Sequence, residues 1–370
     1  MRIRGRAVTP YGVIEDAVVE TRMQHIVAVQ PSGRTRLVDA EAAWIVPGFV
    51  DIHVHGGGGS TFTTGDPGQA RAAAAFHTRH GTTTMLASLV TAPEEVLARA
   101  TKAYQPLIDE EVIAGLHYEG PYLSAARCGA QNPAHLRDPD PDELRRLLDI
   151  GGVRMVTIAP ELPGAVEAIA LLREHGVVAA VGHTDATYDQ TLAAVAAGAT
   201  VATHLANAMR PIHHRDPGAI VALLNSPTVV CEQIADGVHL HDGMLDHVIT
   251  SAGPDRVALI TDAIAAAGMP DGEYELGGLA VSVSDGVARL GAEGSIAGST
   301  LTMDAALRWA VHSGWDITDA VTMASTTPAE AIGLGDERGR LVAGLRADLV
   351  LLDEELRVME VVVAGERYPT

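Results

Sequence analysis

The sequence predicts an α/β protein built as a (β/α)8 barrel of the TIM type, with a small β-sandwich domain formed by both termini. Between about residue 48 and residue 340, short apolar runs alternate regularly with helix-type segments, which is the pattern of a closed parallel barrel. Both ends of the chain instead alternate apolar and polar residues with turns between them, which is typical of short β-strands.

The predicted barrel strands are eight mostly apolar runs. They cover Phe49–His55, Thr82–Ser88, Val112–Glu119, Arg154–Ala159, Val177–His183, Ala199–His204, Thr228–Ala235 and Arg256–Asp262. The segments between them have apolar residues at helical spacing, for example over Pro93–Asp109, Asp142–Asp149, Pro163–His175 and Tyr188–Ala197. An open doubly wound sheet is the alternative, but no G-x-G-x-x-G opens the first helix, and eight regular units favour closure.

We expect the two ends of the chain to form one domain, with the barrel inserted between them. The predicted boundaries are residues 1–47 and 344–370 for the β domain and residues 48–343 for the barrel. The alternative is that the terminal strands merely extend the edge of the barrel. A Gly-rich stretch with β alternation over residues 270–299 predicts a hairpin beside the site.

Composition narrows the class of protein. The chain has 370 residues, of which 47% are hydrophobic and 20% charged, and it contains no apolar run of the ~18 residues that a membrane span needs. A net charge of −21 argues against nucleic acid and membranes as partners. The two cysteines, Cys128 and Cys231, cannot build a disulfide scaffold, and the N-terminus lacks an apolar leader, so we expect a cytoplasmic protein.

Polar side chains end several of the apolar runs, at the edge where a barrel carries its active site. They are His53, His55, Glu119, His183, His204 and Asp262. Burying these groups together is costly unless something neutralises or coordinates them. Imidazole and carboxylate groups are ligands of zinc, iron, manganese and cobalt, so the set predicts a divalent metal, with zinc favoured.

Two His-x-His pairs occur, at His53/His55 and at His239/His241. Residues i and i+2 of a strand point to the same side, so either pair is able to chelate a metal. The first pair ends a predicted strand and precedes a Gly-rich loop, whereas the second lies between a strand and a helix. We therefore assign the first pair to the metal.

The residues around these side chains resemble known motifs. Pro47–Gly56 resembles the strand-one signature of the amidohydrolase superfamily. The segments around the other four metal-ligand candidates, with the closing Gly344–Val350, resemble motifs of the N-acetylglucosamine-6-phosphate deacetylase family. The resemblance covers nearly the whole chain. It implies a metal-dependent hydrolase that converts N-acetylglucosamine 6-phosphate to glucosamine 6-phosphate and acetate, and it implies a homodimer.

The single lysine gives an independent check within this superfamily. Many of its hydrolases bridge two metals with a carboxylated lysine, but Lys102 lies in a helical pattern and not at a strand end. Glu119 is therefore the bridging candidate. This argues against hydrolases that resemble dihydroorotase or urease.

The resemblance also implies two ligand sets that share Glu119. His53, His55, Glu119 and Asp262 would hold one metal, and Glu119, His183 and His204 the other, which gives one or two ions per subunit. Hydroxide formed from metal-activated water would attack the acetamide carbonyl. Asp262 would act as the general base and then as the general acid.

Several residues are predicted to bind the substrate. They are Gln131, Asn207, Ala208, Arg215 and His239. By resemblance, Arg215 and His239 bind the phosphate, and Asn207 and Ala208 supply amide donors. Gln131 stands where many relatives carry a histidine that holds the substrate carbonyl; glutamine still donates a hydrogen bond but carries no charge.

These features leave the exact sugar open. Ala206 also departs from the family pattern, since relatives often have an aromatic residue at this position. N-acetylgalactosamine 6-phosphate, or another N-acyl amino-sugar phosphate, is the nearest alternative substrate. A hydrolase of another N-acyl amide and a catalytically silent assembly protein are further alternatives. Arg215 and His239 argue against an uncharged substrate, and the complete ligand set argues against a silent barrel.

Overall fold

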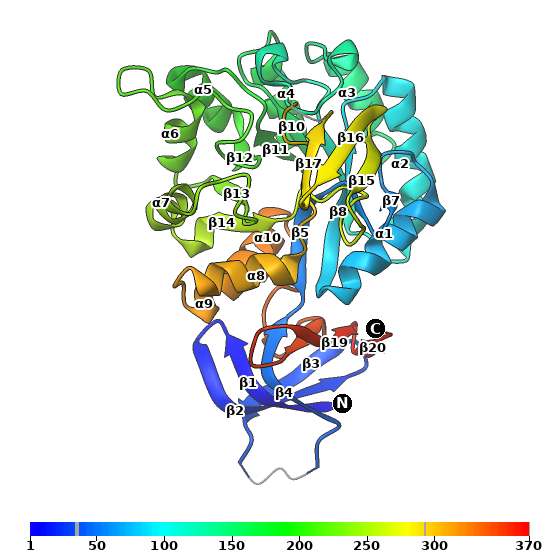
Figure 1. Cartoon of the computed structure of the whole chain (residues 1–370), viewed down its shortest axis with the longest axis vertical. Helices are drawn as coiled ribbons and strands as arrows, with labels where there is room; N and C mark the ends of the chain where they lie inside the picture. Colours follow the sequence, from blue (N-terminus) through cyan, green and yellow to red (C-terminus); the bar gives the residue numbers. More distant parts are fainter. Residues whose placement is uncertain (34–36, 292–293, 370) are drawn as a thin grey trace.

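The computed structural model describes residues 1–33, 37–291 and 294–369. Residues 34–36 fall inside the predicted terminal domain, and residues 292–293 inside the predicted hairpin stretch; these positions and residue 370 lie outside the described residues. The barrel with its surrounding helices forms one part of the molecule, and a sheet that contains both termini forms the other (Figure 1).

Eight parallel strands form the barrel sheet, in the order β14-β13-β12-β11-β10-β9-β8-β5. The strands are β5 (Phe49–Val54), β8 (Thr82–Val90), β9 (Gly115–Glu119), β10 (Val153–Ile158), β11 (Val178–Val181), β12 (Ala199–Ala202), β13 (Val230–Ile234) and β14 (Val257–Ile260). Each overlaps the run predicted for it. The predicted barrel is therefore confirmed.

Helices cover the outside of the barrel (Figure 1). They are α1 (Pro67–Arg79), α2 (Glu94–Asp109), α3 (Pro141–Leu148), α4 (Ala165–Glu174), α5 (Tyr188–Ala197), α6 (Gly218–Leu224), α7 (Asp242–Ala252) and α8 (Met303–His312), followed by α9 (Ile317–Val321) and α10 (Thr327–Ala331). Local sequence sets where they begin: Thr187 and Gln190 form a reciprocal capping box at the start of α5. In the described part of the chain, no helix has the length and apolar character to cross a membrane.

The two ends of the chain meet in a seven-stranded sheet with the order β20-β19-β18-β4-β1-β2-β3. Its strands are β1 (Arg2–Thr9), β2 (Gly12–Arg22), β3 (His25–Pro31), β4 (Ala40–Pro47), β18 (Leu349–Leu352), β19 (Val358–Val363) and β20 (Glu366–Tyr368). The predicted β domain of both termini takes the form of this one continuous sheet, with an apolar cluster of its own that includes Ile3, Val19 and Leu349. The exact domain boundaries stay a prediction.

Two small sheets lie among the loops of the barrel. One pairs β6 (Gly56–Gly57) with β7 (Ser60–Thr61), and the other joins β15 (Gly272–Leu276), β16 (Leu279–Ser284) and β17 (Val287–Leu290). The second packs Leu276 and Val281 against Ile264 and Ala266, which follow β14. The stretch predicted as a hairpin is thus a three-stranded sheet anchored on the loop that carries Asp262.

The seam of the barrel between β5 and β14 combines a buried side chain, Asp51, with backbone hydrogen bonds just beyond the strands. The Asp51 carboxylate accepts hydrogen bonds from the Thr261 hydroxyl at 2.5 Å and from the Thr261 amide at 3.3 Å. It also accepts from the His53 amide at 3.2 Å. The Asp262 amide donates to the His53 carbonyl at 2.8 Å. This seam fixes two predicted metal-ligand residues relative to each other.

Candidate metal centre and active site

The predicted metal-ligand residues lie together at the carboxyl ends of the barrel strands. His53 lies within β5 and Glu119 ends β9, whereas the others follow their strands by one or two residues. Their side chains are all buried; this holds for His53, His55, Glu119, His183, His204 and Asp262. The parallel strands explain this convergence, because their carboxyl ends open on one face of the barrel.

Glu119 lies at the centre of the histidines. Its Oε1 is 2.9 Å from His183 Nε2, 3.1 Å from His204 Nε2 and 3.5 Å from His53 Nε2. Its Oε2 is 3.2 Å from His55 Nε2. The donor atoms form two groups that share this carboxylate, and within each group all atoms lie within 4.8 Å of one another.

The hydrogen bonds of the histidine Nδ1 atoms indicate the state of the Nε2 atoms that face Glu119. Nδ1 of His55 lies 3.2 Å from the Ser88 carbonyl oxygen, and Nδ1 of His183 lies 2.9 Å from the Arg127 carbonyl oxygen. A carbonyl only accepts hydrogen bonds, so these Nδ1 atoms carry the proton and the Nε2 lone pairs face Glu119. Lone pairs and a carboxylate that converge in this way repel one another unless a cation lies between them. The residues therefore fit a divalent metal.

The electrostatics of the site follow from this crowding. Burial lowers the pKa of His55, but the Asp262 and Glu119 carboxylates raise it more, to about 9, so a proton on Nε2 competes with a metal for the position between ring and carboxylate. Burial raises the pKa of Glu119, but the neighbouring histidines, above all His53, bring it well below the usual range. The pKa of Asp262 is raised by burial but lowered overall by His53 and His55. Both carboxylates are therefore ionised at neutral pH, the state in which they bind metals.

Backbone strain is concentrated at the same strand ends. His183, His204 and Asp262 have φ angles of 47°, 28° and 50°, in the left-handed region that costs a non-glycine residue free energy. Each of these residues lies two positions beyond its strand. From these turns, His183 and His204 reach Glu119, and Asp262 reaches His53 and His55. Strain of this kind persists only where surrounding contacts hold it.

A cavity of about 320 Å³ opens onto these residues. Its walls include His55, Glu119, His183, His204, Asp262, Gln131, Asn207, Ala208 and His239. The three-stranded sheet borders it through Leu276. The cavity therefore brings together five of the six predicted metal-ligand residues, all but His53, and four of the five residues predicted to bind the substrate, all but Arg215.

Gln131 is buried and turned toward the metal centre. Its amide nitrogen donates to Glu119 Oε2, and its amide oxygen accepts from the Thr91 amide at 2.8 Å. Gln131 thus orients the Glu119 carboxylate in this structure. Its predicted contact with the substrate stays a prediction.

The two residues predicted to bind the phosphate, His239 and Arg215, lie in different places. His239 lines the cavity, with its Nδ1 2.7 Å from Asp236 Oδ2. Arg215 is exposed, does not line the cavity, and contacts His214 Nε2 through Nη1 at 2.7 Å. The structure therefore does not bring Arg215 into the site of its own chain.

The second His-x-His pair has no chelating arrangement. His241 precedes α7, where its Nδ1 accepts a hydrogen bond from the Gly243 amide at 3.1 Å. His239 instead pairs with Asp236. The choice of the first pair for the metal is consistent with this geometry.

Glu232, which was not predicted from the sequence, lies in β13 and is fully buried. Its Oε2 is 3.0 Å from His53 Nδ1. The available signal was an acidic residue within the apolar run Val229–Ile234, a position where an unpaired carboxylate is costly.

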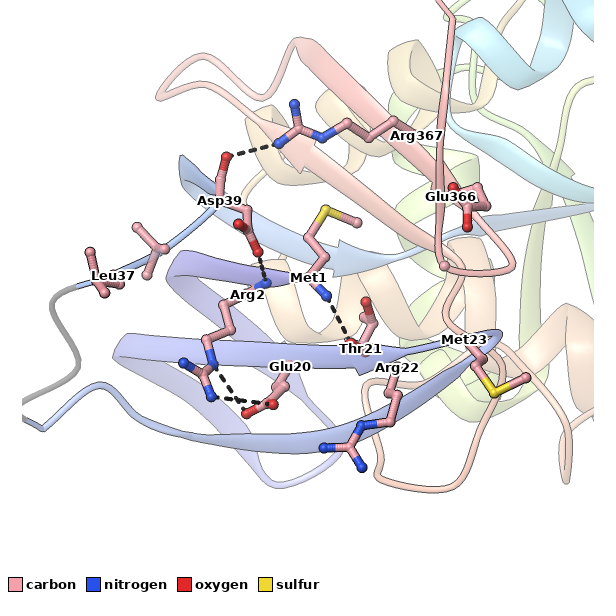
Figure 2. Close-up of a pocket in the computed structure, with 12 residues that line it drawn as sticks. Met1, Arg2, Glu20, Thr21, Arg22, Met23, Leu37, Asp39, Glu366 and Arg367 are labelled. Carbon is pink, nitrogen blue, oxygen red and sulfur yellow. Dashed lines mark hydrogen bonds and ion pairs between the residues drawn. The ribbon is translucent and has the colours of Figure 1, made fainter.

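A second and larger cavity, of about 1050 Å³, is lined by residues of the terminal sheet (Figure 2) and by none of the predicted metal ligands. Several of its charged groups contact each other or the backbone. Arg2 Nε lies 3.4 Å from Glu20, and Arg367 donates to the Asp39 carbonyl at 2.8 Å. Neither metal-ligand group lies there. We therefore place the active site in the smaller cavity.

Comparison with known proteins agrees with this geometry. Residues 44–367 match the model of the amidohydrolase family. The chain therefore belongs to the amidohydrolase family, which its sequence motifs resemble.

Within this family, the chain is similar to amino-sugar phosphate deacetylases. It is 36% identical over 360 residues to an N-acetylglucosamine-6-phosphate deacetylase of Lysinibacillus sphaericus, covering 95% of this chain and 91% of that protein. It is 35% identical over 368 residues to an N-acetylgalactosamine-6-phosphate deacetylase of Escherichia coli O157:H7, covering 98% and 97%.

A solved structure is also similar over the full length. It is a mutant of the N-acetyl-D-glucosamine-6-phosphate deacetylase of Mycobacterium smegmatis, in complex with N-acetyl-D-glucosamine 6-phosphate. The TM-score is 0.97 at 46% identity, covering 100% of this chain and 99% of that chain. The predicted resemblance to this group of deacetylases is confirmed.

Proposed function

We propose that this protein hydrolyses the acetamide of N-acetylglucosamine 6-phosphate to glucosamine 6-phosphate and acetate, with a divalent metal. The observation that carries the proposal is the Glu119 carboxylate between two pairs of histidines, with Asp262 in the wall of the same cavity. The similarity to deacetylases of phosphorylated amino sugars supports this substrate class.

Asp262 is the residue that moves protons in this proposal. Its Oδ1 lies 3.2 Å from His55 Nε2 and 3.5 Å from His53 Nε2, beside the ligand groups. A divalent metal supplies Lewis acidity that polarises the amide carbonyl and activates a water molecule. Asp262 accepts the proton of that water and donates it to the amine nitrogen as the C–N bond breaks. The water oxygen leaves in acetate.

We propose two ions per subunit, with zinc favoured over iron, manganese or cobalt. The support is that two complete ligand groups share one carboxylate. Imidazole nitrogens and carboxylate oxygens are the usual zinc ligands of hydrolytic sites. Asp262 would complete the group of His53 and His55.

The phosphate would bind near His239 and Asn207, which line the cavity. We propose that the protein forms a homodimer and that the exposed Arg215 serves the phosphate site of the partner subunit. The support is that Arg215 lies on an exposed loop and does not line the cavity of its own chain. Arg215→Met should then raise KM for a phosphorylated substrate by about 10-fold or more, as expected when a charge-assisted hydrogen bond is lost.

A cytoplasmic location belongs to the same proposal. Both cysteines are free, Cys231 buried and Cys128 partly exposed. Unpaired thiols are typical of a reducing compartment.

N-acetylgalactosamine 6-phosphate is the second candidate substrate, because relatives that carry that name are as similar as the others. The test is acetate release from both phosphorylated amino sugars and from unphosphorylated N-acetylglucosamine, with metal content measured on the same sample. We expect metal-dependent release that is faster with the phosphorylated sugars. Equal rates with and without phosphate would contradict the roles of His239 and Arg215, and no release from any of the three would contradict the proposed function.

A further inference from the structure

Glu232 contacts both metal-ligand groups without belonging to either. One oxygen atom, Oε2, accepts a hydrogen bond from His53 Nδ1 at 3.0 Å and another from the His204 amide at 3.0 Å. His53 belongs to one ligand group and His204 to the other. Glu232 lies on β13, which pairs with β12, the strand that precedes His204, and with β14, the strand at the seam with β5 that carries His53. A single carboxylate oxygen therefore links the two halves of the centre.

The contact with His53 fixes the state of its ring. A carboxylate only accepts hydrogen bonds, so His53 carries its proton on Nδ1 and directs the Nε2 lone pair toward Glu119 and Asp262. His53 Nε2 lies 3.5 Å from an oxygen of each. Carboxylate–histidine pairs of this kind orient a metal ligand and raise its basicity.

The contact with His204 holds a strained turn. His204 has a φ angle of 28°, and its amide donates to the Glu232 side chain while the next amide, that of Leu205, donates to the Glu232 carbonyl at 3.0 Å. Two successive amides are thus bound by one residue. This is the kind of surrounding contact that a strained backbone needs to persist.

The burial of Glu232 indicates that this side chain does not stabilise the fold. The residue has no exposed surface, and its Oε1 has no hydrogen-bond partner among the described residues. A buried carboxylate that is only partly compensated lowers the stability of a fold. An apolar residue in this strand would serve the barrel core better.

We propose that Glu232 is a positioning residue for both metal-ligand groups, holding the ring of His53 and the backbone of His204 at the same time. This inference rests on the proposed function for the identity of the centre. It predicts that one substitution weakens metal binding at two sites whose ligands come from four other strands.

The test compares three variants by metal affinity. Glu232→Gln keeps one accepting oxygen but loses the charge, Glu232→Met removes both hydrogen bonds, and Asp304→Asn is the matched control. Asp304 is also a buried carboxylate beside a histidine, 3.2 Å from His80 Nδ1, but it lies outside the metal centre. Zinc affinity is measured by competition with a chromogenic chelator, and the geometry of the centre by the visible spectrum of the cobalt-loaded protein.

We expect zinc affinity to fall about 10-fold in Glu232→Gln and up to 100-fold in Glu232→Met, as for other residues that orient metal ligands. The cobalt spectrum should change in both, and Asp304→Asn should match the wild type. The melting temperature of metal-free Glu232→Gln should not fall, because the substitution removes a buried charge. If Glu232→Met fails to fold, Glu232→Gln carries the test.

Wild-type zinc affinity and an unchanged cobalt spectrum in Glu232→Gln and Glu232→Met would overturn the inference. A loss of the same size in Asp304→Asn would also overturn it, because the effect would then be a general loss of stability. These readouts are independent of the reaction. If the wild type binds zinc but releases no acetate from any amino sugar, the proposed function fails while the positioning role of Glu232 stands.

Discussion

At the scale of single residues, Asp262 combines backbone strain, burial and proximity to the ligand histidines. Its left-handed turn is held by the hydrogen bond from its amide to the His53 carbonyl, at 2.8 Å. Its carboxylate lies in the cavity wall beside His55. A side chain in this position touches both the metal centre and the space that a substrate would fill.

Asp262→Asn tests the proton transfer. We expect kcat to fall by about 10²- to 10⁴-fold, the usual contribution of a general acid–base residue. Asparagine keeps an oxygen of similar size but neither accepts nor donates the transferred proton. Metal should remain with Glu119, His183 and His204, which do not depend on Asp262. The measurement is kcat together with metal content per chain, and an undiminished kcat would contradict the assignment.

Some residues of the site could be predicted from the sequence and others could not. The strand-end histidines and carboxylates could be predicted because each interrupts an apolar run at a known edge of the barrel. Glu232 could not, because its role depends on contacts with two other strands. The hydrogen bond from Gln131 to Glu119 could not be predicted either, because it depends on the conformation of the loop that follows β9.

At the scale of elements, the seam between β5 and β14 decides the geometry of the centre. The Asp51 side chain crosses from one strand to the other and accepts three hydrogen bonds, two of them from Thr261. Burial raises the pKa of Asp51 to about 7, although these hydrogen bonds lower it. The residues that follow on each strand, His53 and Asp262, are thereby placed side by side.

Asp51→Asn should weaken this seam, because the amide group would turn a donor toward groups that already donate. We expect the free energy of unfolding of the metal-free protein to fall by about 1–3 kcal/mol, the cost of an unsatisfied buried polar group. Denaturant unfolding measures this loss. A double-mutant cycle with Thr261→Val checks the cause, since residues in contact should give non-additive effects. Additive losses would show that the seam does not depend on this pair.

The strands and helices themselves were predictable from periodicity, because apolar runs of strand length and helical spacing recur in order. The closure of the barrel was predicted only from the number of strand–helix units, which is eight. The particular contact that closes it was not, because Asp51 reads in sequence as a polar residue within an apolar strand and its partner Thr261 lies far along the chain.

At the scale of the whole molecule, a partly buried ionic contact joins two helices that are far apart in the chain, α1 and α8. Asp304, near the start of α8, lies 3.2 Å from Nδ1 of His80, which follows α1, and 2.8 Å from Nη1 of Arg308. Burial raises the pKa of Asp304, but hydrogen bonds from its neighbours, His80 first, lower it to about 2. The folded state therefore favours the ionised carboxylate.

A folded-state pKa below the unfolded value means that this stabilisation is present above about pH 4 and is lost as the pH falls toward 2. Asp304→Asn should lower the free energy of unfolding by about 2 kcal/mol at pH 7, because the pKa of Asp304 falls to about 2 in the folded state. The difference from the wild type should shrink toward zero near pH 2. Denaturant unfolding at neutral and acidic pH measures this, and a pH-independent difference would contradict the electrostatic cause.

The arrangement of the termini was also predictable in outline. Alternating residues at both ends indicated strands, and the structure joins them in one sheet in which β18 pairs with β4. The role of Arg215 could not be predicted from the fold of one chain, because its proposed contact lies in another subunit.

With a net charge of −21, the protein must attract a phosphate ester through local positive charge in the cavity and not through its overall field.

The most direct test of the central claim is a metal titration of the chelator-stripped protein, with acetate release from N-acetylglucosamine 6-phosphate followed at each step. We expect no release without metal and recovery as zinc is added, complete at two ions per chain. Full acetate release by protein that holds less than one metal ion per chain would contradict it.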